Sequence, residues 1–308
     1  MRVVFMHISL KQFKIIEAVV DYNSYTEAAK ALYMTQPAVS MQIKQIEGQL
    51  GLQLFERSGK QIKATEAGKE LLHYARNIRQ QMEEAKTVLE ELKGLKRGKL
   101  HLTMASTASY FAPRLLAAFH HQYPGVKVTL DVTNRSGLLD ALDNNTTDMA
   151  IMGRPPEGHA LTGIPFLDNP LVVIAWPEHP LACSDSIPLS DVADESFIVR
   201  EAASGTRMAT ERYFSEHRLS LTPGMEMNRS EAIKQAVMAE LGLGIVSLHT
   251  IEMELTLKRL VILKVEDFPI MRHWYIVHRN NKRFAAIQKV FRDFAVSESR
   301  SLLQFPAY

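Results

Sequence analysis

Apolar and polar positions follow a helical period near the start of the chain, in SYTEAAKALYMTQPAVSMQIKQIEGQL over residues 24–50. Apolar residues recur there at spacings of four, three and four, which places them on one face of a helix. These residues are Val39, Ile43, Ile46 and Leu50. Before them, Ser24 and Glu27 have the spacing of a capping box and open a shorter, alanine-rich helix. The segment therefore predicts two helices joined by a tight turn at Tyr33 and Met34.

The second helix has a polar face opposite its apolar one. Thr35 can cap its start, and a proline lies in its first turn, where the missing N–H does no harm. The polar face comprises Gln36, Pro37, Ser40, Met41 and Lys44. A helix-turn-helix lays the N-terminal residues of its second helix in the major groove of DNA. The pattern favours DNA binding, although an ordinary helical hairpin in a globular domain has the same spacing.

A basic hairpin is predicted directly after these helices. Leu54–Arg57 and Gln61–Thr65 read as short strands around Ser58–Gly59–Lys60, and they carry Arg57 and Lys63. A wing of this kind holds phosphates without reading bases. We therefore expect Arg57 on the DNA backbone. The full set of expected DNA-binding residues is Ser24, Tyr25, Thr26, Thr35, Gln36, Pro37, Ser40, Met41, Lys44 and Arg57.

A long helix is predicted from Thr65 to about Lys93. Its apolar residues alternate at spacings of four and three, which is a heptad seam. They are Leu71, Ala75, Ile78, Met82, Ala85, Leu89 and Leu92. The stripe can pack against its own domain or against the same helix of a second subunit. We favour the second interpretation because Arg, Glu and Lys crowd the other faces. A dimer would present paired recognition helices to an inverted-repeat site in DNA.

After a break at Gly94–Gly98, which marks a domain boundary, strands alternate with helices. We expect strands at residues 99–105, 126–132, 149–152, 171–175, 197–199, 245–247 and 274–278. We expect helices at residues 111–123, 136–144, from 206 onward, 230–241 and 284–298. Alternation of this kind predicts an α/β fold with a parallel sheet covered by helices.

Polar side chains follow the carboxyl ends of several of these strands, where open α/β sheets bind ligands. Hydroxyls and amides at helix starts suit an anion, and arginines add charge-assisted hydrogen bonds. The candidates are Ser106, Thr107, Asn134, Arg135, Arg154, Arg200, Glu201, Ser204, Thr206, Arg207 and Ser247. Taken singly, each has a structural explanation, since Ser204 and Thr206 are also good helix caps. The cluster as a whole predicts a site for an anionic metabolite.

The chain resembles the LysR-type transcriptional regulators over nearly its whole length. LKQF, TEAAKALYMTQPAVSMQIKQIE and LFERSGKQIKATEAG, all within residues 10–68, match that family's N-terminal domain. Within the family the chain is most similar to the CbbR group, which controls operons of the Calvin cycle and its carboxylase (RuBisCO). The closer match is carried by NSYTEAA, YFAPRL, LDVTNR, DNPLVVIA, SGTR and IVSLHTIEMEL.

The resemblance implies a winged helix-turn-helix domain over residues 6–65 and a dimerising linker helix over 66–94. A periplasmic-binding-protein-like effector domain would follow over 99–308, with one lobe at about 99–166 and 270–308 and the other at about 167–269. It also implies a dimer or tetramer on double-stranded DNA, contact with RNA polymerase during activation, and carbon-fixation genes as targets. The implied effector is a phosphorylated sugar or acid, or NADPH, and no covalently bound cofactor is expected. A regulator of another metabolic operon is the alternative within the family.

Composition and missing motifs bear on the other classes of protein. The chain has 308 residues, 46% of them hydrophobic and 23% charged, with a net charge of +2, as expected for a globular protein of two or three domains. A single cysteine, Cys183, and the lack of a signal peptide or spanning segment predict a cytoplasmic protein away from membranes. No nucleophile elbow, metal-ligand spacing or phosphate-binding glycine loop is present. An enzyme on the two-lobed fold would leave residues 24–92 unexplained, and a nonspecific DNA binder would leave the cleft without a role.

Overall fold

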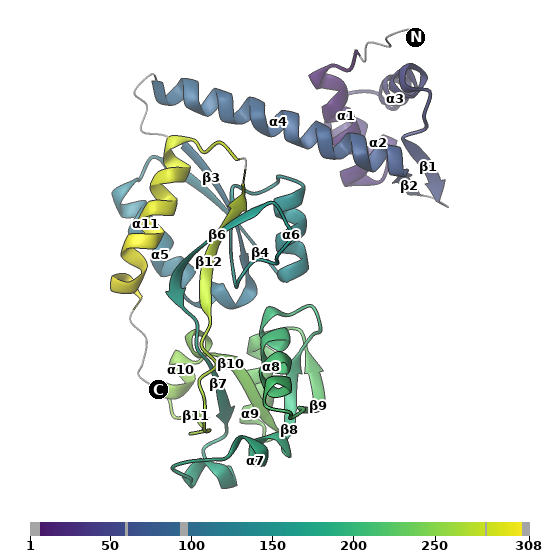
Figure 1. Cartoon of the computed structure of the whole chain (residues 1–308). Coiled ribbons are helices and arrows are strands. Elements are labelled where there is room, and N and C mark those ends of the chain that lie inside the picture. The colour runs from purple at the N-terminus through teal and green to yellow at the C-terminus, as the bar shows by residue number, and fades with distance from the viewer. Residues whose placement is uncertain (1–6, 59–60, 93–97, 281, 304–308) are drawn as a thin grey trace. The chain divides into compact units, whose positions relative to one another are not determined.

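The computed structural model describes residues 7–58, 61–92, 98–280 and 282–303 (Figure 1). The chain divides into two compact units, Met1–Leu89 with Asn144–Thr146, and Glu90–Asp143 with Thr147–Tyr308. The predicted turn at Gly59–Lys60 and the predicted break at residues 94–97 lie outside the described residues.

The first unit is a helical domain with a small β-hairpin. Its elements are α1 (Leu10–Tyr22), α2 (Tyr25–Ala31), α3 (Gln36–Leu50), β1 (Phe55–Ser58), β2 (Gln61–Ala64) and α4 (Glu66–Leu92). The hydroxyls of Ser24 and Thr35 accept hydrogen bonds from the amides of Glu27 and Ala38, so both predicted caps form. The predicted capping box at Ser24 is only half made, because the carboxylate of Glu27 pairs with Lys30 at 2.8 Å instead.

The core of this unit holds the helix-turn-helix together. Val39, Ile43 and Ile46 of α3 are buried as the spacing predicts, and they pack with α1 and with the alanines of α2. Glu47 fixes the hairpin to the end of α3, since its Oε1 accepts hydrogen bonds from the amides of Leu54 at 2.8 Å and Phe55 at 3.3 Å. These hydrogen bonds fix the position of the hairpin relative to α3.

The heptad stripe of α4 has two environments. Leu71 and Ala75 are buried in the core of the first unit, which is the packing that the sequence left open as the alternative to a dimer. Further along, Ile78, Met82 and Leu89 are 36%, 54% and 60% exposed. The first part of the stripe therefore belongs to its own domain, and the later part is an apolar surface on an otherwise polar helix.

One lobe of the second unit is built on a sheet with strand order β4-β3-β5-β12-β6. Its strands are β3 (Gly98–Ala105), β4 (Val126–Thr133), β5 (Met149–Met152), β6 (Leu161–Asp168) and β12 (His273–Arg279). Its helices are η1 (Ser106–Tyr110), α5 (Ala112–Gln122), α6 (Arg135–Asp143) and α11 (Ala286–Leu302). Alternate residues of β5 face opposite cores, so α5 and α11 cover one face of the sheet and α6 covers the other (Figure 1).

The other lobe repeats this arrangement with strand order β11-β7-β10-β8-β9. Its strands are β7 (Leu171–Ala175), β8 (Ser196–Arg200), β9 (Thr222–Met227), β10 (Leu243–Ser247) and β11 (Val261–Ile262). Its helices are η2 (Pro180–Cys183), α7 (Leu189–Ala193), α8 (Gly205–Glu216), α9 (Ser230–Met238), η3 (Leu248–Thr250) and α10 (Glu252–Thr256). Helices α7 and α8 pack on one face of this sheet, and α9 packs on the other.

The sequence-based prediction of a parallel sheet is wrong in both lobes, because each sheet is mixed. Strand β12 pairs antiparallel with β5 and β6, and β10 pairs antiparallel with β7. The reason is the path of the chain: β12 returns from the other lobe and enters its sheet in the opposite direction. The prediction also missed β6, β9 and β11, and it extended α9 to Leu241. Helix α9 ends earlier because Glu240 takes a positive φ of 62°.

The chain crosses between the lobes at two places that are paired with each other. The amide of Asn169 donates to the carbonyl of Arg272 at 2.8 Å. Leu171 and Ile270 exchange reciprocal backbone hydrogen bonds of 3.0 Å. The lobe boundaries expected from the resemblance, near residues 166 and 270, lie within a few residues of these crossings.

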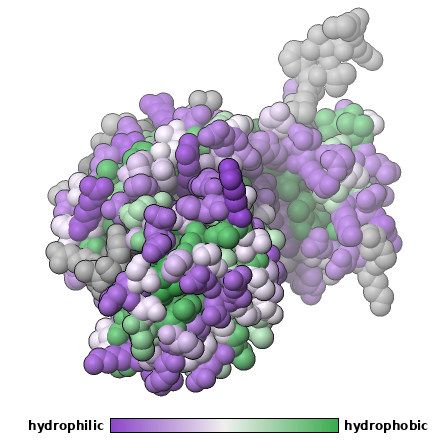
Figure 2. Space-filling view, turned by 60° about the horizontal axis from the view of Figure 1, so that its bottom comes forward, coloured by the Kyte–Doolittle hydropathy of each residue, from purple (hydrophilic) through white to green (hydrophobic). Residues whose placement is uncertain are grey.

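Polar residues cover most of the face seen in Figure 2, with apolar residues gathered in patches between them. The largest buried side chains, such as Phe119 and Phe214, lie inside the lobes. Of the helices that the structure describes, none has the length and apolar character needed to span a membrane.

Helix α4 must approach the hairpin closely, and Gly68 permits it. A Cβ at Gly68 would collide with the backbone carbonyl oxygen of Leu54. We predict that Gly68→Ala destabilises the first unit by about 1–3 kcal/mol, the usual cost of overpacking. Hydrogen exchange measured by mass spectrometry should show faster exchange in peptides from residues 10–75 and unchanged exchange in peptides from the second unit.

Gly48→Ala is the matched control, because a Cβ at Gly48 meets nothing within 4 Å. Alanine is the better helix former by about 1 kcal/mol, so this variant should exchange no faster than the parent chain. Equal exchange in the parent chain and in Gly68→Ala would show that the close approach does not constrain the fold.

Candidate functional site

The N-terminal half of α3 presents a polar surface on the first unit. Gln36, Pro37 and Lys44 are exposed, and Met41 is 62% exposed. Ser40 is half-buried beside them. The structure therefore places the predicted major-groove residues on one exposed face, opposite the buried Val39, Ile43 and Ile46.

The remaining predicted DNA-binding residues flank this surface. Thr26 and Thr35 are exposed, and Ser24 is half-buried as the cap of α2. Tyr25 packs edge-on against Phe55 with ring centroids 6.1 Å apart, so its ring also belongs to the domain core. Arg57 is exposed on β1, where it lies opposite Ile62 in the hairpin register. These side chains can donate hydrogen bonds to phosphate oxygens.

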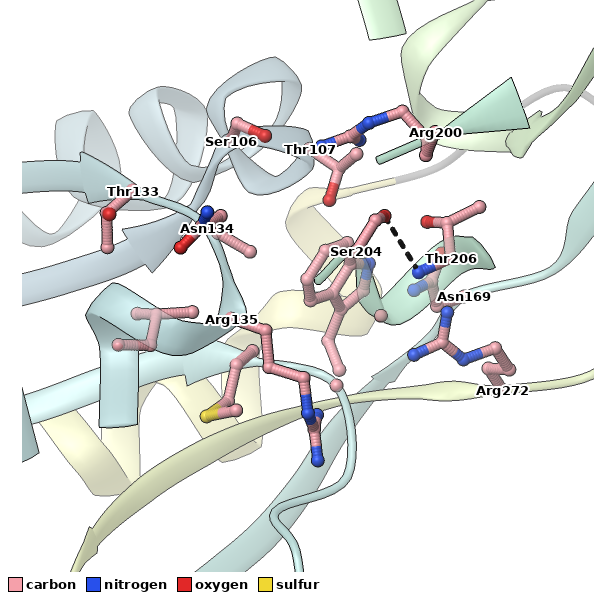
Figure 3. A pocket seen from close by; sticks show the side chains of 16 residues that line it. Ser106, Thr107, Thr133, Asn134, Arg135, Asn169, Arg200, Ser204, Thr206 and Arg272 are labelled. Carbon is pink, nitrogen blue, oxygen red and sulfur yellow. Dashed lines mark hydrogen bonds between the residues drawn. The ribbon is translucent and has the colours of Figure 1, made fainter. Parts of the chain in front are cut away.

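A separate pocket lies in the second unit, between its lobes (Figure 3). Its cavity volume is about 40 Å³, which is below the roughly 300–1,000 Å³ of most small-molecule sites, so only a small group fits inside it. The starts of η1, α6 and α8 border it, at Ser106, Arg135 and Gly205. We call this hollow the inner pocket. Its lining residues are Ala105, Ser106, Thr107, Thr133, Asn134, Arg135, Leu138, Met152, Gly153, Asn169, Arg200, Ser204, Gly205, Thr206, Arg272 and Trp274.

The structure brings most of the predicted effector residues together at this pocket. They are Ser106, Thr107, Asn134, Arg135, Arg200, Ser204 and Thr206. Local hydrogen bonds set two of the helix starts: Asn134 Oδ1 accepts from the amide of Gly137 at 3.1 Å, and Ser204 Oγ accepts from the amide of Thr206 at 3.2 Å (Figure 3). Thr107 and Ser204 present their hydroxyls towards the same space in Figure 3.

Other predicted effector residues do not line the inner pocket, because each has a different partner. Arg207 pairs with Glu211 at 2.7 Å and with Glu226 at 2.5 Å. Arg154 is exposed and pairs with Glu157 at 3.2 Å. The placement of Arg207 has a simple cause: it follows Thr206 on α8, and the helical turn points it to the carboxylates on its outer side.

Glu201 and Ser247 act through residues that do line the pocket. Glu201 holds Arg200 in a bidentate pair, with Nε–Oε2 at 2.8 Å and Nη2–Oε1 at 3.0 Å. Arg200 also donates to Ser230 at 3.3 Å, so this buried guanidinium is largely satisfied by the protein. Ser247 is buried and donates to Oδ1 of Asn169 at 2.7 Å, which fixes the amide of Asn169 at the pocket wall.

Arg272 is the principal pocket residue that the sequence did not reveal. Among the residues that the structure describes, no carboxylate pairs with its side chain. Its Nη2 lies so close to Gly153 and Gly205 that Cβ atoms there would be 2.5 and 3.6 Å away. Burial, with repulsion from Arg135 and Arg212, lowers the pKa of Arg272 to about 10. The group is therefore still a cation at neutral pH, held without a counter-charge beside the positive end of α8.

Asn169, Thr133 and Trp274 were also missed. Asn169 and Arg272 lie at the crossings between the lobes, where no strand-to-helix pattern marks a ligand site. Trp274 opens β12, and its Nε1 donates to Nδ1 of His249 at 3.3 Å. Burial lowers the pKa of His249 to about 4, so its ring is neutral and can accept this bond. A sequence signal did exist in the polar run Asp168–Asn169 directly before a buried strand.

The arrangement is suited to binding a small anion. Hydroxyls, amides, helix starts and the guanidinium of Arg272 line one hollow, and each can stabilise negative charge. Within the described residues, no group of three or more His, Cys, Asp or Glu side chains is placed to hold a metal ion.

Comparison with known proteins gives the same division of the chain. Residues 10–69 match the model for bacterial regulatory helix-turn-helix proteins of the lysR family. Residues 93–300 match the model for the LysR substrate binding domain. The solved structure of full-length CbnR with its target DNA is 18% identical and covers 95% of this chain and 100% of its own, with a TM-score of 0.70. At that identity the likeness shows the fold alone.

Closer relatives span the same length. A RuBisCO operon transcriptional regulator of Allochromatium vinosum is 52% identical over 294 residues, covering 96% of this chain and 97% of its own. The activator CmpR of Synechocystis is 41% identical over 298 residues, covering 96% and 98%. The regulatory domain of Synechocystis CcmR, solved in complex with 2-PG, is 41% identical and covers 65% of this chain and 97% of its own, with a TM-score of 0.63. The chain therefore belongs to the LysR family of bacterial transcriptional regulators.

Proposed function

We propose that this regulator controls carbon-fixation genes in response to a small phosphorylated metabolite. Its 52% identity to a RuBisCO operon regulator, over nearly the full length of both chains, supports the target genes. The 2-PG complex of the CcmR domain supports the class of ligand. The observation that carries the ligand assignment is the guanidinium of Arg272, half-buried at the inner pocket without a carboxylate partner among the described residues.

The proposal assigns DNA binding to residues 6–65, with Gln36, Pro37, Ser40, Met41 and Lys44 in the major groove. The helix of residues 66–94 forms a dimer through the exposed part of its stripe, which includes Met82 and Leu89. A solitary helix this long gains stability by burying such a stripe. The twofold axis of that dimer would pair two recognition surfaces on an inverted repeat.

The effector-binding domain, residues 99–308, would sense the metabolite in the inner pocket. A ligand shifts a conformational equilibrium only by as much as it binds one arrangement better than another. Thr107 and Thr206 come from the two lobes and Arg272 comes from a crossing between them, so a bound anion would interact with each of these parts at once. The binding energy of the anion therefore depends on the relative position of the two lobes. This dependence is what allows the ligand to shift the conformational equilibrium.

We predict that Lys44→Ala weakens binding to the specific operator. Lys44 is exposed on the groove-facing side of α3, and loss of a contact to a base edge costs about 1–3 kcal/mol, or roughly tenfold or more in affinity. Fluorescence anisotropy with operator and scrambled duplexes at one salt concentration measures both affinities. The ratio of specific to nonspecific affinity should fall.

Lys14→Ala provides the control, because Lys14 is an exposed lysine on α1 and the charge change is identical. It should leave the ratio unchanged. Full operator affinity in Lys44→Ala would exclude α3 as the surface that reads the operator.

We predict that Arg272→Met greatly reduces binding of phosphorylated ligands. Hydrogen bonds to a charged group are worth about 1.5–3 kcal/mol, so affinity for 2-PG should fall about 10- to 100-fold. Gly153→Ala should act in the same direction, because its Cβ would displace the guanidinium of Arg272. Isothermal titration calorimetry with 2-PG measures the loss.

Arg259→Met serves as the control, since Arg259 is exposed and lines neither the inner pocket nor its surroundings. Its affinity for the ligand should equal that of the parent chain. If Arg272→Met binds 2-PG as tightly as the parent chain does, the inner pocket is not the effector site.

A further inference from the structure

A larger hollow, which the assignment of an effector site does not use, lies next to the inner pocket and shares three lining residues with it. This outer cleft has a volume of about 420 Å³. Its lining residues are Arg135, Arg154, Pro155, Glu157, Gly205, Met208, Ala209, Arg212, Met271, Arg272, His273 and Tyr275. Arg135, Gly205 and Arg272 line both hollows, so the two spaces are neighbours that share two arginines.

Cations outnumber anions around the outer cleft. Arg154 and Arg212 come from opposite lobes, and Arg135 joins them by donating to the carbonyl of Arg154 at 3.0 Å. Glu157 pairs with Arg154 at 3.2 Å, and Glu216 pairs with Arg212 at 3.5 Å. Both carboxylates are well exposed, and exposed pairs of this kind are weak. A stronger anion can therefore displace either carboxylate at little cost.

The arginines also act on one another. Arg135 and Arg212 both lower the pKa of Arg272 by repulsion, and burial lowers the pKa of Arg135 itself. Like charges so arranged favour an anion that lies between them. A ligand in the inner pocket would place one anionic group there. Arg154 and Arg212, however, line the outer cleft and not the inner pocket.

The floor of the outer cleft suits the uncharged part of a ligand. Met208 and Met271 are 50% and 52% exposed, and Tyr275 lies with them along the cleft. Exposed methionines beside arginines offer adaptable apolar contact without a fixed shape. A ligand that extends out of the inner pocket would lay its carbon chain or ring on these side chains.

We propose that the outer cleft is a second anion subsite, in which Arg154 and Arg212 bind the distal anionic group of a ligand whose first group lies in the inner pocket. The inference rests on the inner pocket being the effector site. It narrows the ligand class to molecules that carry anionic groups at two separated positions. Such a ligand contacts arginines of both lobes, so it reports their arrangement more strongly than a single anion does.

The test compares pentane-1,5-diyl bisphosphate with pentyl monophosphate, which share a carbon chain and differ in the second phosphate. Isothermal titration calorimetry on the full-length protein measures both affinities. Linking a second binding group raises the local concentration of that group, so the bisphosphate should bind at least about tenfold more tightly. Arg212→Met should remove that advantage and leave the monophosphate affinity unchanged.

The variants test the second subsite and the inner pocket separately. Arg212 is exposed, so its replacement should leave thermal melting unchanged, and Arg259→Met again controls for the loss of one positive charge. Equal affinities of the two probes for the parent chain, no binding of the bisphosphate, or equal weakening of both probes by Arg212→Met would overturn the second subsite. Unchanged binding of both probes to Arg272→Met would instead overturn the inner pocket.

Discussion

The inner pocket depends on the pairing of the two chain crossings. Asn169 and Arg272 are joined by a backbone hydrogen bond of 2.8 Å, and the reciprocal bonds of Leu171 and Ile270 continue the pairing into the second lobe. These bonds hold the amide of Asn169 and the guanidinium of Arg272 at one wall of the inner pocket. Partial burial of the guanidinium of Arg272 is unfavourable, and a bound anion at this wall would offset that cost.

Contacts behind the pocket tie the lobes together. Arg114 pairs with Glu252 at 2.6 Å, the hydroxyl of Tyr110 donates to Glu231 at 3.2 Å, and Trp274 donates to His249. Tyr110 ends η1, whose first residues, Ser106 and Thr107, line the inner pocket. Any large opening of the lobes breaks these interactions. A ligand that favours an opened arrangement of the lobes must therefore break this defined set of bonds. The difference between its affinities for the two arrangements sets how far the equilibrium between them shifts.

The long helix shows how one apolar period can serve two purposes. Leu71 and Ala75 pack into the first unit, whereas Met82 and Leu89 remain exposed on the same stripe. The sequence predicted the stripe but could not divide it, because a heptad pattern is the same whether the partner is a domain core or another helix. The division follows from Gly68, which lets the start of α4 lie against the carbonyl of Leu54.

The sequence by itself determined the local structure: helix faces from spacing, caps from Ser24 and Thr35, and polar residues at helix starts such as Ser106 and Ser204, which line the inner pocket. These features depend on neighbours a few residues apart, so they can be read along the chain. Only the tertiary structure decided that Arg207 turns to Glu211 and Glu226 while Arg272 reaches the pocket. It also decided that β12 enters its sheet antiparallel. Such outcomes depend on residues more than a hundred positions apart, and no local period or charge pattern records which distant groups the fold brings together.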